Sequence, residues 1–352
     1  MTRAVVFLLR RAVAGVFTLV AMVSLTFTIF WATPTQPARF VYQHQLLTND
    51  EIRQANHLLG TDEPKLEQWV HYVTHLLRFD FGTMWESSFL TGNGQLVRPP
   101  IAPLVDPALR TTLSLLLGGA FLVLLLAVPL GTFAGSRLGS VGDRTVSLVA
   151  LLGVCTHPMV IGILVRSLFA HRLHWLPPTG YCPLRNGAPG CTGIVAWADH
   201  LVLPWVTFAL LFLALYIRMV RASVAETLHE DFVRTARAKG ASPLRILSAH
   251  VLPNTALRIL TMIGMEIGTA IGVCIYIETA YRLPGLASVA VRAMAGDSAA
   301  LDLPLILAVV FVISLIVVAG NLVVDAFTLF VDPRVAIARG RATTKSAAGG
   351  VI

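Results

Sequence analysis

The stretch EDFVRTARAKGASPLRILSAHVLPNT, Glu230 to Thr255, is a long polar and basic segment between two hydrophobic spans. It stands out because the rest of the chain is strongly apolar. Of 352 residues, 55% are hydrophobic and 13% are charged, and the mean hydropathy is +0.73. A soluble domain is less apolar than this. The composition therefore predicts a protein that crosses a membrane several times, with this segment held in water between two crossings.

Six apolar segments are long enough to cross a bilayer, since each runs for about 20 residues without interruption. Inside hydrocarbon only helices and closed barrels satisfy their own backbone hydrogen bonds, and continuous rather than alternating runs indicate helices. The segments fall near residues 13–31, 113–133, 145–169, 201–219, 257–280 and 303–327. We predict an all-α membrane protein with six transmembrane helices and a long extracytoplasmic loop between the first and the second.

The placement of the basic residues predicts the orientation of these helices. With the N-terminus inside, the cytoplasmic segments hold most of the arginines and lysines, and the short outer loops hold few. The positive-inside rule then places both termini in the cytoplasm. The long first loop does not count, because loops of that length are translocated regardless of charge. The expected parts are residues 1–31 (tail and first helix), 32–110 (extracytoplasmic loop), 111–330 (core with five helices) and 331–352 (cytoplasmic tail).

Within the first loop, the residues after Asp62 and Pro64 predict a helix. Apolar side chains recur there at helical spacing, namely Leu66, Trp69, Val70, Val73, Leu76 and Leu77. Asp62 is suited to the N-cap and Pro64 to the first turn. An apolar stripe of this kind must pack on another part of the protein, so we expect the loop to be ordered.

The Glu230 to Thr255 stretch resembles the EAA loop of ABC importer permeases. In that pattern an acidic residue and two small residues precede a glycine, and a Leu-Pro pair follows at a fixed distance. The matching residues are Thr235, Ala236, Gly240, Leu252 and Pro253. Arg234 stands where the pattern has glutamate, and His250 where it has isoleucine. The variant RTARAKG is typical of the branch that imports peptides and nickel.

Other segments resemble the same branch and follow in the same order. They are LLGTDEPKLEQWVHYVTHLLRFDFGTMW in the first loop, with Phe81 and Met84 as variants, then LHWLPPTGY, LVLPWVTF, IETAYRLPGL and NLVVDAFTLFVDPRV. The resemblance covers nearly the whole chain. By it, the chain is identified as a member of the permease subunits of the dipeptide, oligopeptide and nickel importers, most similar to the B-type subunits of dipeptide permeases.

The resemblance implies a type I importer fold in the bacterial inner membrane, in which residues 221–255 couple transport to an ATPase. It implies four kinds of protein partner or ligand: a second permease subunit, two cytoplasmic ATPase subunits, an extracytoplasmic substrate-binding protein and a peptide. The chain contains no GxxxxGK[ST] sequence, so ATP and magnesium are expected on the partner ATPases, and we expect no cofactor and no catalytic activity here. The net charge of +8 does not indicate nucleic-acid binding, because the basic residues are placed as the positive-inside rule expects for a membrane protein.

Two alternatives remain open from the sequence. A nickel or haem importer of the same branch uses nearly the same permease sequence. A stand-alone channel or secondary transporter would be expected to show inverted repeats with broken helices, and no repeat is evident here.

The residues expected to couple to the ATPase are those of the EAA loop. By the resemblance, two short helices around Gly240 dock into a groove of the ATPase, and glycine suits the turn because it adopts a left-handed conformation without a clash. The alternative is an ordinary basic loop, but charge alone does not require this spacing. The candidate coupling residues are Thr235, Ala236, Ala238, Lys239, Gly240, Ala241, Ser242, Leu252 and Pro253.

Five residues of the fifth span are candidates for helix packing or for the translocation pathway. Gly264, Gly268 and Gly272 share one helix face, which allows close approach of a neighbouring span or of a partner permease. Glu266 and Glu278 are candidates for the pathway, because a carboxylate facing lipid is costly and should face water or a polar partner. Glu266 alternatively stays protonated and hydrogen-bonds a neighbouring helix.

Cys182 and Cys191 lie in the second outer loop, where an oxidising compartment permits a disulfide, whereas Cys155 and Cys274 lie within spans. A bond closing so short a loop would stabilise it by roughly 2 to 3 kcal/mol. The alternative is two free thiols. His171 and His174 lie near Cys182, but their spacing fits no established ligand motif, so we expect no metal site there.

Overall fold

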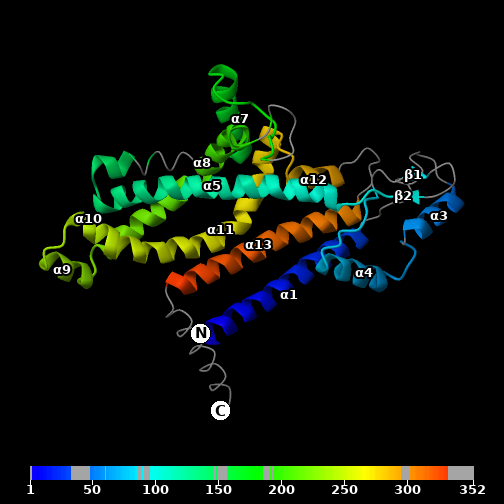
Figure 1. Cartoon of the computed structure of the whole chain (residues 1–352), viewed down its shortest axis with the longest axis horizontal. Helices are drawn as coiled ribbons and strands as arrows, with labels where there is room; N and C mark the ends of the chain where they lie inside the picture. Colours follow the sequence, from blue (N-terminus) through cyan, green and yellow to red (C-terminus); the bar gives the residue numbers. More distant parts are fainter. Residues whose placement is uncertain are drawn as a thin grey trace, which may run out of the picture. The chain divides into compact units, whose positions relative to one another are not determined.

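The computed structural model describes residues 2–32, 48–59, 61–85, 89–90, 96–145, 148, 157–184, 191, 193–294 and 302–331. These residues are helical apart from loops and one antiparallel hairpin of β1 (Phe89–Leu90) and β2 (Leu96–Val97). Five helical stretches among them are long and apolar enough to cross a membrane. They contain α1 (Thr2–Ala32), α5 (Ala102–Ser136), α8 (Ile194–Thr227), α11 (Leu252–Tyr281) and α13 (Leu303–Val331) (Figure 1). The predicted all-helical membrane fold is confirmed.

The third predicted span, residues 145–169, is described mainly in its second half. There α7 (Pro158–Arg166) continues into a π-helical stretch, η1 (Ser167–Arg172). His157 caps α7, because its side chain accepts a hydrogen bond from the backbone N–H of Met159 at 3.3 Å. Residues 146–147 and 149–156 lie outside the described part of the chain, so a sixth complete span stays a prediction.

Several helices are longer than the apolar segments that predict them. The second span was predicted at 113–133, but α5 begins at Ala102, and α8 extends beyond 201–219 at both ends. At 1.5 Å per residue, a helix of 34 residues is roughly 50 Å long, more than the roughly 30 Å of the hydrocarbon layer. Hydropathy marks only the part of a helix suited to lipid, whereas the backbone hydrogen bonds continue into the polar flanks.

The chain divides into two compact units. Unit 1 comprises Met1–Ala12, Ser114–Tyr281 and Ala319–Ile352, and it contains the Glu230 to Thr255 stretch. Unit 2 comprises Val13–Leu113 and Arg282–Val318, and it contains the long first loop. The boundary between the units divides three helices, α1, α5 and α13, each of which has one part in each unit.

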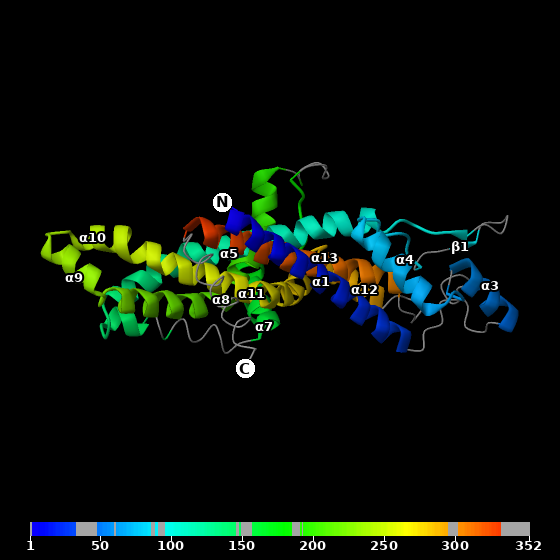
Figure 2. The same ribbon diagram turned by 90° about the horizontal axis from the view of Figure 1, so that it is seen from below.

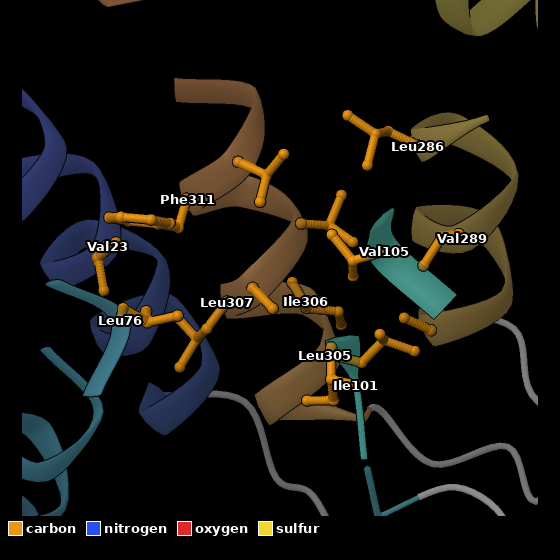
Figure 3. Close-up of a cluster of buried hydrophobic side chains, with 14 of the residues drawn as sticks. Val23, Leu76, Ile101, Val105, Leu286, Val289, Leu305, Ile306, Leu307 and Phe311 are labelled. Atoms are coloured by element: carbon orange, nitrogen blue, oxygen red, sulfur yellow. The ribbon is translucent and has the colours of Figure 1, made fainter. Parts of the chain in front are cut away.

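Unit 2 has a core of buried aliphatic side chains built from segments far apart in the sequence (Figure 3). Helix α13 supplies much of it, and α12 (Leu286–Met294) packs there too. Residues labelled in Figure 3 are Val23 of α1, Leu76 of α4, Ile101 and Val105 at the start of α5, Leu286 and Val289 of α12, and Leu305, Ile306, Leu307 and Phe311 of α13. The helix α4 of the first loop therefore packs on long apolar helices of the chain.

The described part of the first loop includes two helices, α3 (Asn49–Leu59) and α4 (Lys65–Leu77). Helix α4 lies where the sequence predicts a helix. Val73 and Leu76 are buried, and Trp69 donates a hydrogen bond from Nε1 to Ser24 Oγ of α1 at 3.0 Å. This part of the predicted apolar stripe packs as expected.

The rest of the predicted apolar stripe does not pack against the core. Leu66, Val70 and Leu77 are exposed, because the described core contacts only one narrow side of α4. The predicted cap at Asp62 is also wrong. Pro64 occupies the N-cap position without a side-chain hydrogen bond, and the Asp62 carboxylate instead lies 3.1 Å from Nδ1 of His57.

Asp302 joins the end of the first loop to α13. Its carboxylate accepts hydrogen bonds from the backbone N–H of Leu305, at 3.1 Å, and from that of Trp85, at 2.8 Å. The first bond satisfies an N–H group in the first turn of α13, where a negative charge is also favoured. One buried carboxylate thus caps a transmembrane helix and positions the loop.

In unit 1, glycines of α5 allow α8 to approach closely. A methyl group added at Gly131 would lie 2.7 Å from Cβ of Val220, and one at Gly135 would lie 2.6 Å from the carbonyl oxygen of Arg221. Any side chain at these positions would therefore push the two helices apart. The sequence predicts a glycine face for close helix packing in the fifth span, but not this one in the second span.

Candidate functional site: the coupling loop

Two short helices lie on either side of Gly240, α9 (Asp231–Ala238) and α10 (Pro243–Ile246). Figures 1 and 2 show both at one end of α8 and α11, the helices that lead into and out of them. Ser242 caps α10 by accepting a hydrogen bond from the backbone N–H of Arg245 at 3.4 Å. Pro243 follows at the first helical position, where its missing N–H has no cost. The pair of short helices agrees with the prediction.

Gly240 ends α9 in a Schellman motif. Its φ is +81°, in the left-handed region. The Gly240 N–H donates to the carbonyl of Arg237 at 3.0 Å, and the Ala241 N–H donates to the carbonyl of Ala236 at 3.1 Å. These are the two hydrogen bonds of the motif, and they satisfy carbonyls that the end of a helix leaves without partners. Gly240, Ala236 and Ala241 thus belong to one turn, which directs the chain into α10.

The two short helices pack on a small apolar core. Its buried members come from α8, α9, α10 and the π-helical stretch η2 (Leu247–Val251): Val220, Val224, Val233, Ile246 and Val251. All five are at most 3% exposed. The loop is therefore a packed element fixed to the end of α8.

Polar contacts between α8 and α11 hold the two ends of the loop together. Ser223 Oγ donates to Thr255 Oγ1 at 3.3 Å, and both side chains are buried. Beside them, the guanidinium of Arg258 pairs with the carboxylate of Glu226. Because both contacts join α8 to α11, a force on α9 or α10 reaches both long helices.

The surface of the loop exposes most of the predicted coupling residues. Thr235, Ala238, Lys239, Gly240 and Ser242 are exposed, whereas Ala236 and Ala241 are partly buried in the turn. Two apolar side chains that the sequence analysis did not single out are exposed beside them, Phe232 at 43% and Leu244 at 76%. The same surface carries Arg234, Arg237 and Arg245. It thus combines positive charge with apolar anchors.

The Leu-Pro pair that ends the resemblance lies where the loop becomes a transmembrane helix. Leu252 and Pro253 begin α11 directly after η2. Proline has no N–H, so the carbonyl four residues earlier loses its usual donor, and a π-helical turn is one way for a helix to accommodate this. The pair therefore marks a local change of helical pitch between the loop and α11.

An ion pair between a buried carboxylate and a partly exposed arginine, which the sequence does not indicate, lies beside the base of the loop. The Asp143 side chain is 3% exposed and accepts two hydrogen bonds from Arg221 of α8, one from Nε and one from Nη2 at 2.8 Å. The N–H of Gly139, whose φ is +76°, donates to the same carboxylate at 2.9 Å. The hydrogen bonds from Arg221 and Gly139 lower the pKa of Asp143 to about 2. The segment after α5 is thereby clamped to α8.

Helix α11 presents one open face along most of its length. Met265, at 77%, and Gly268, Thr269, Ile275 and Tyr276 are exposed at spacings that place them on one side of the helix. A methyl group added at Gly268 or Gly272 would meet no atom within 4 Å, whereas one at Gly264 would lie 3.3 Å from Val324 of α13. Gly264 thus packs inside the chain, and the other two glycines belong to the open face.

The two acidic residues predicted for the pathway have different surroundings. Glu278 is 1% exposed and interacts inside the chain, so it does not line an open surface here, and that assignment is not supported. Glu266 is partly exposed and follows Met265, which belongs to the open face, so it lies at the edge of that face.

The second outer loop is closed by a disulfide between Cys182 and Cys191, whose Cα atoms are 5.0 Å apart. The N–H of Gly180 also donates to the carbonyl of Tyr281 at 3.2 Å, which fixes the loop to the end of α11. Nearby, His171 Nδ1 lies 3.4 Å from the carbonyl oxygen of Arg166. Across the part of the chain that the structure describes, no three His, Cys, Asp or Glu side chains are gathered as a metal site.

We expect the Cys182 and Cys191 thiols to resist alkylation in the purified chain until a reductant is added. The intact mass after alkylation, with and without reductant, measures this directly. The other two cysteines are Cys274, which is buried in α11, and Cys155, which lies outside the described residues, so a denaturing step without reductant labels these two and calibrates the reaction. Labelling of both outer cysteines without reductant would contradict the bond.

The sequence of residues 127–337 matches the family described as binding-protein-dependent transport system inner membrane component. Residues 4–85 match the N-terminal region of the same membrane components. The first match alone covers more than half of the chain. The chain belongs to this family. It is therefore a multi-pass inner-membrane permease component of an ABC importer, not an enzyme, and it works with separate ATPase subunits, which bind ATP, and with a binding protein.

Several relatives are similar to this chain over almost their entire length. A probable peptide ABC transporter permease of Sinorhizobium fredii is 32% identical over 330 residues, covering 94% of this chain and 99% of the relative. The oligopeptide transport system permease AppB of Bacillus subtilis is 28% identical over 332 residues, covering 94% and 98%. A putative peptide permease of Brucella ovis is 28% identical over 330 residues, covering 94% and 98%.

Proposed function

We propose that this chain imports dipeptides or oligopeptides as one of two permease subunits, with α9 and α10 as its connection to the ATPase. The observation that carries the mechanism is the Schellman turn at Gly240, which fixes two short helices on a packed base and leaves their outer surface open. The peptide permeases among the relatives support the substrate class.

In this mechanism the ATPase pushes on the exposed surface of α9 and α10. Leu244 and Phe232 supply apolar contacts and the arginines supply charge, which together favour a specific, water-excluding interface. The core under the loop and the bond between Ser223 and Thr255 keep α8 and α11 together. Nucleotide-driven closure of the ATPases would therefore tilt α8 and α11 as one body.

The open face of α11 is the proposed contribution of this chain to the translocation pathway and to its contact with the second permease. Gly268 and Gly272 permit close approach there, and Thr269 and the nearby Glu266 supply polar groups. Alternating access would follow from tilting this face relative to its counterpart on the partner. With both termini in the cytoplasm, loop 32–110 faces the substrate-binding protein outside.

Purification of the chain from its native membrane with bound partners tests the proposal. We expect a second permease and two ATPase subunits to co-purify, and reconstituted vesicles to take up a labelled dipeptide when ATP is enclosed and the binding protein is added. Uptake of nickel or haem in place of peptide would assign the complex to the alternative cargo. Purification as a chain without ATPases, with transport independent of ATP, would overturn the proposal.

For the pathway, we expect Glu266→Gln to lower peptide uptake about tenfold while leaving assembly unchanged. A hydrogen bond between a carboxylate and the amino terminus of a peptide is worth about 1.5 to 3 kcal/mol, and the amide removes the charge while keeping the shape. Initial uptake rates in vesicles measure the effect, and Glu266→Asp, which keeps the charge, is the matched control. Unchanged uptake by Glu266→Gln across neutral pH would leave the charge without a role.

A further inference from the structure

The first loop forms a polar cavity, open to solvent, that has no part in the coupling mechanism. Its volume is about 400 Å³, and it lies entirely within unit 2. Three histidines line it, His57 of α3 and His71 and His75 of α4. Glu63 also faces it. Imidazole and carboxylate groups in one cavity are the donor types that bind divalent transition metals.

Two of the histidines are already paired on one side of a helix. His71 and His75 are four residues apart in α4, so their side chains project from successive turns of the same face. Their ring centroids are 4.2 Å apart. This is the spacing at which two helical histidines share one metal ion in the HExxH motif. The rings are therefore near each other without any change in the backbone.

A carboxylate contacts one ring nitrogen of His75. Its Nδ1 lies 2.7 Å from Oδ2 of Asp80, which leaves Nε2 available for a ligand. Asp80 is itself fixed, because its other oxygen accepts a hydrogen bond from the N–H of Gly82 at 3.0 Å. A carboxylate bonded to the second ring nitrogen is the usual support of a metal-binding histidine, since it sets the tautomer and raises the basicity of the ligand.

His57 repeats this arrangement on the neighbouring helix. Its Nδ1 lies 3.1 Å from Oδ2 of Asp62, and its ring lines the same cavity as His71 and His75. The helix that carries the pair is held rigidly, because Val73 and Leu76 are buried in the core of unit 2. Two of the three histidines, His57 and His75, are thus oriented by a carboxylate, and the His57 side chain is 84% exposed.

We propose that His71 and His75 form a binding site for a divalent transition metal ion such as Zn²⁺. Two imidazole nitrogens coordinate the ion at about 2.0 to 2.1 Å, which leaves further positions for water or for a third side chain. In the structure as described, these positions are not filled by a third protein ligand. His57 and Glu63 line the same cavity but are not gathered with the pair into a group of three ligands, so water completes the coordination of the ion.

Isothermal titration of the full-length chain with Zn²⁺, in detergent and purified without a polyhistidine tag, tests the proposal. We expect one Zn²⁺ per chain in the wild type and loss of that binding in the double variant His71→Ala with His75→Ala. Asp80→Asn should keep the stoichiometry but weaken the affinity about 10- to 100-fold, as expected for loss of a carboxylate behind a ligand. Mg²⁺, which prefers oxygen ligands, should not bind there.

The matched control is the double variant His171→Ala with His174→Ala, two histidines of the other outer loop that stand three residues apart. This control should bind Zn²⁺ as the wild type does. Circular dichroism of each variant checks that the helical content is unchanged. Equal Zn²⁺ binding by the wild type and the His71 and His75 double variant would overturn the proposal, and so would the absence of binding to the folded wild type. Neither result depends on transport.

Discussion

Gly240→Val is expected to abolish ATP-driven uptake while the chain still inserts and assembles. A β-branched residue resists the φ of +81° found here, and a left-handed conformation costs a residue with a side chain about 1 to 2 kcal/mol. Loss of the Schellman turn, with a new direction for α10, therefore has the lower free energy. Uptake and substrate-stimulated ATP hydrolysis by reconstituted complexes measure the change, and we expect both to fall to background.

Gly240→Asn is the control that separates backbone conformation from the loss of a glycine. Asparagine adopts the left-handed region more readily than other side chains, and a Cβ at Gly240 meets no atom of this chain within 4 Å. We therefore expect Gly240→Asn to retain much of the transport activity. Normal uptake by Gly240→Val, or equal loss in both variants, would show that the left-handed turn is not what couples the loop.

Asp143→Ala is expected to destabilise the chain by about 1.5 to 3 kcal/mol, because the charged hydrogen bonds of the pair are lost, while the Arg221 side chain, 32% exposed, is solvated by water. The Arg221 guanidinium would lose two hydrogen bonds, and the Gly139 turn would lose its acceptor. The melting temperature of the purified chain in detergent should fall by about 5 °C or more. Uptake should fall as well, because the segment after α5 would no longer be fixed to α8.

Glu226→Ala removes the other ion pair near the loop and serves as the control. The side chains of Glu226 and Arg258 are 59% and 48% exposed, and pairs of this kind contribute about 0 to 1 kcal/mol. Its melting temperature should therefore stay close to that of the wild type. An equal effect of both variants would mean that burial does not distinguish the two pairs.

The pH dependence of the Asp143 clamp follows from its lowered pKa. The folded pKa of about 2 lies below the usual value of about 3.9, so the stabilisation is complete above about pH 5 and is lost as pH falls through 4 toward 2. Between pH 5 and pH 8 the difference in melting temperature between wild type and Asp143→Ala should stay constant. A difference that vanishes near pH 6 would show that another group carries the effect.

The candidate site was predictable where its geometry depends on neighbours in the sequence. The turn at Gly240 needs one left-handed residue, and its hydrogen bonds join residues at most five apart, so the segment indicates it directly. Helix α4 was predicted for the same reason, from its apolar spacing. Its burial was predicted less well, because the side of a helix that packs depends on partners such as Val23 and Phe311 from other parts of the chain.

By itself, the sequence determined that this protein is a helical membrane protein with a basic loop between two spans, since apolar length, charge placement and a glycine turn act over short stretches. Its resemblance to ABC importer permeases added the role of a permease. Only the tertiary structure decided that Asp143 binds Arg221, 78 residues away, and that Glu278 is buried. It also decided that the glycines of α5 receive α8, and that His57 shares a cavity with His71 and His75. These contacts depend on how helices cross, and side-chain packing between distant segments sets that crossing.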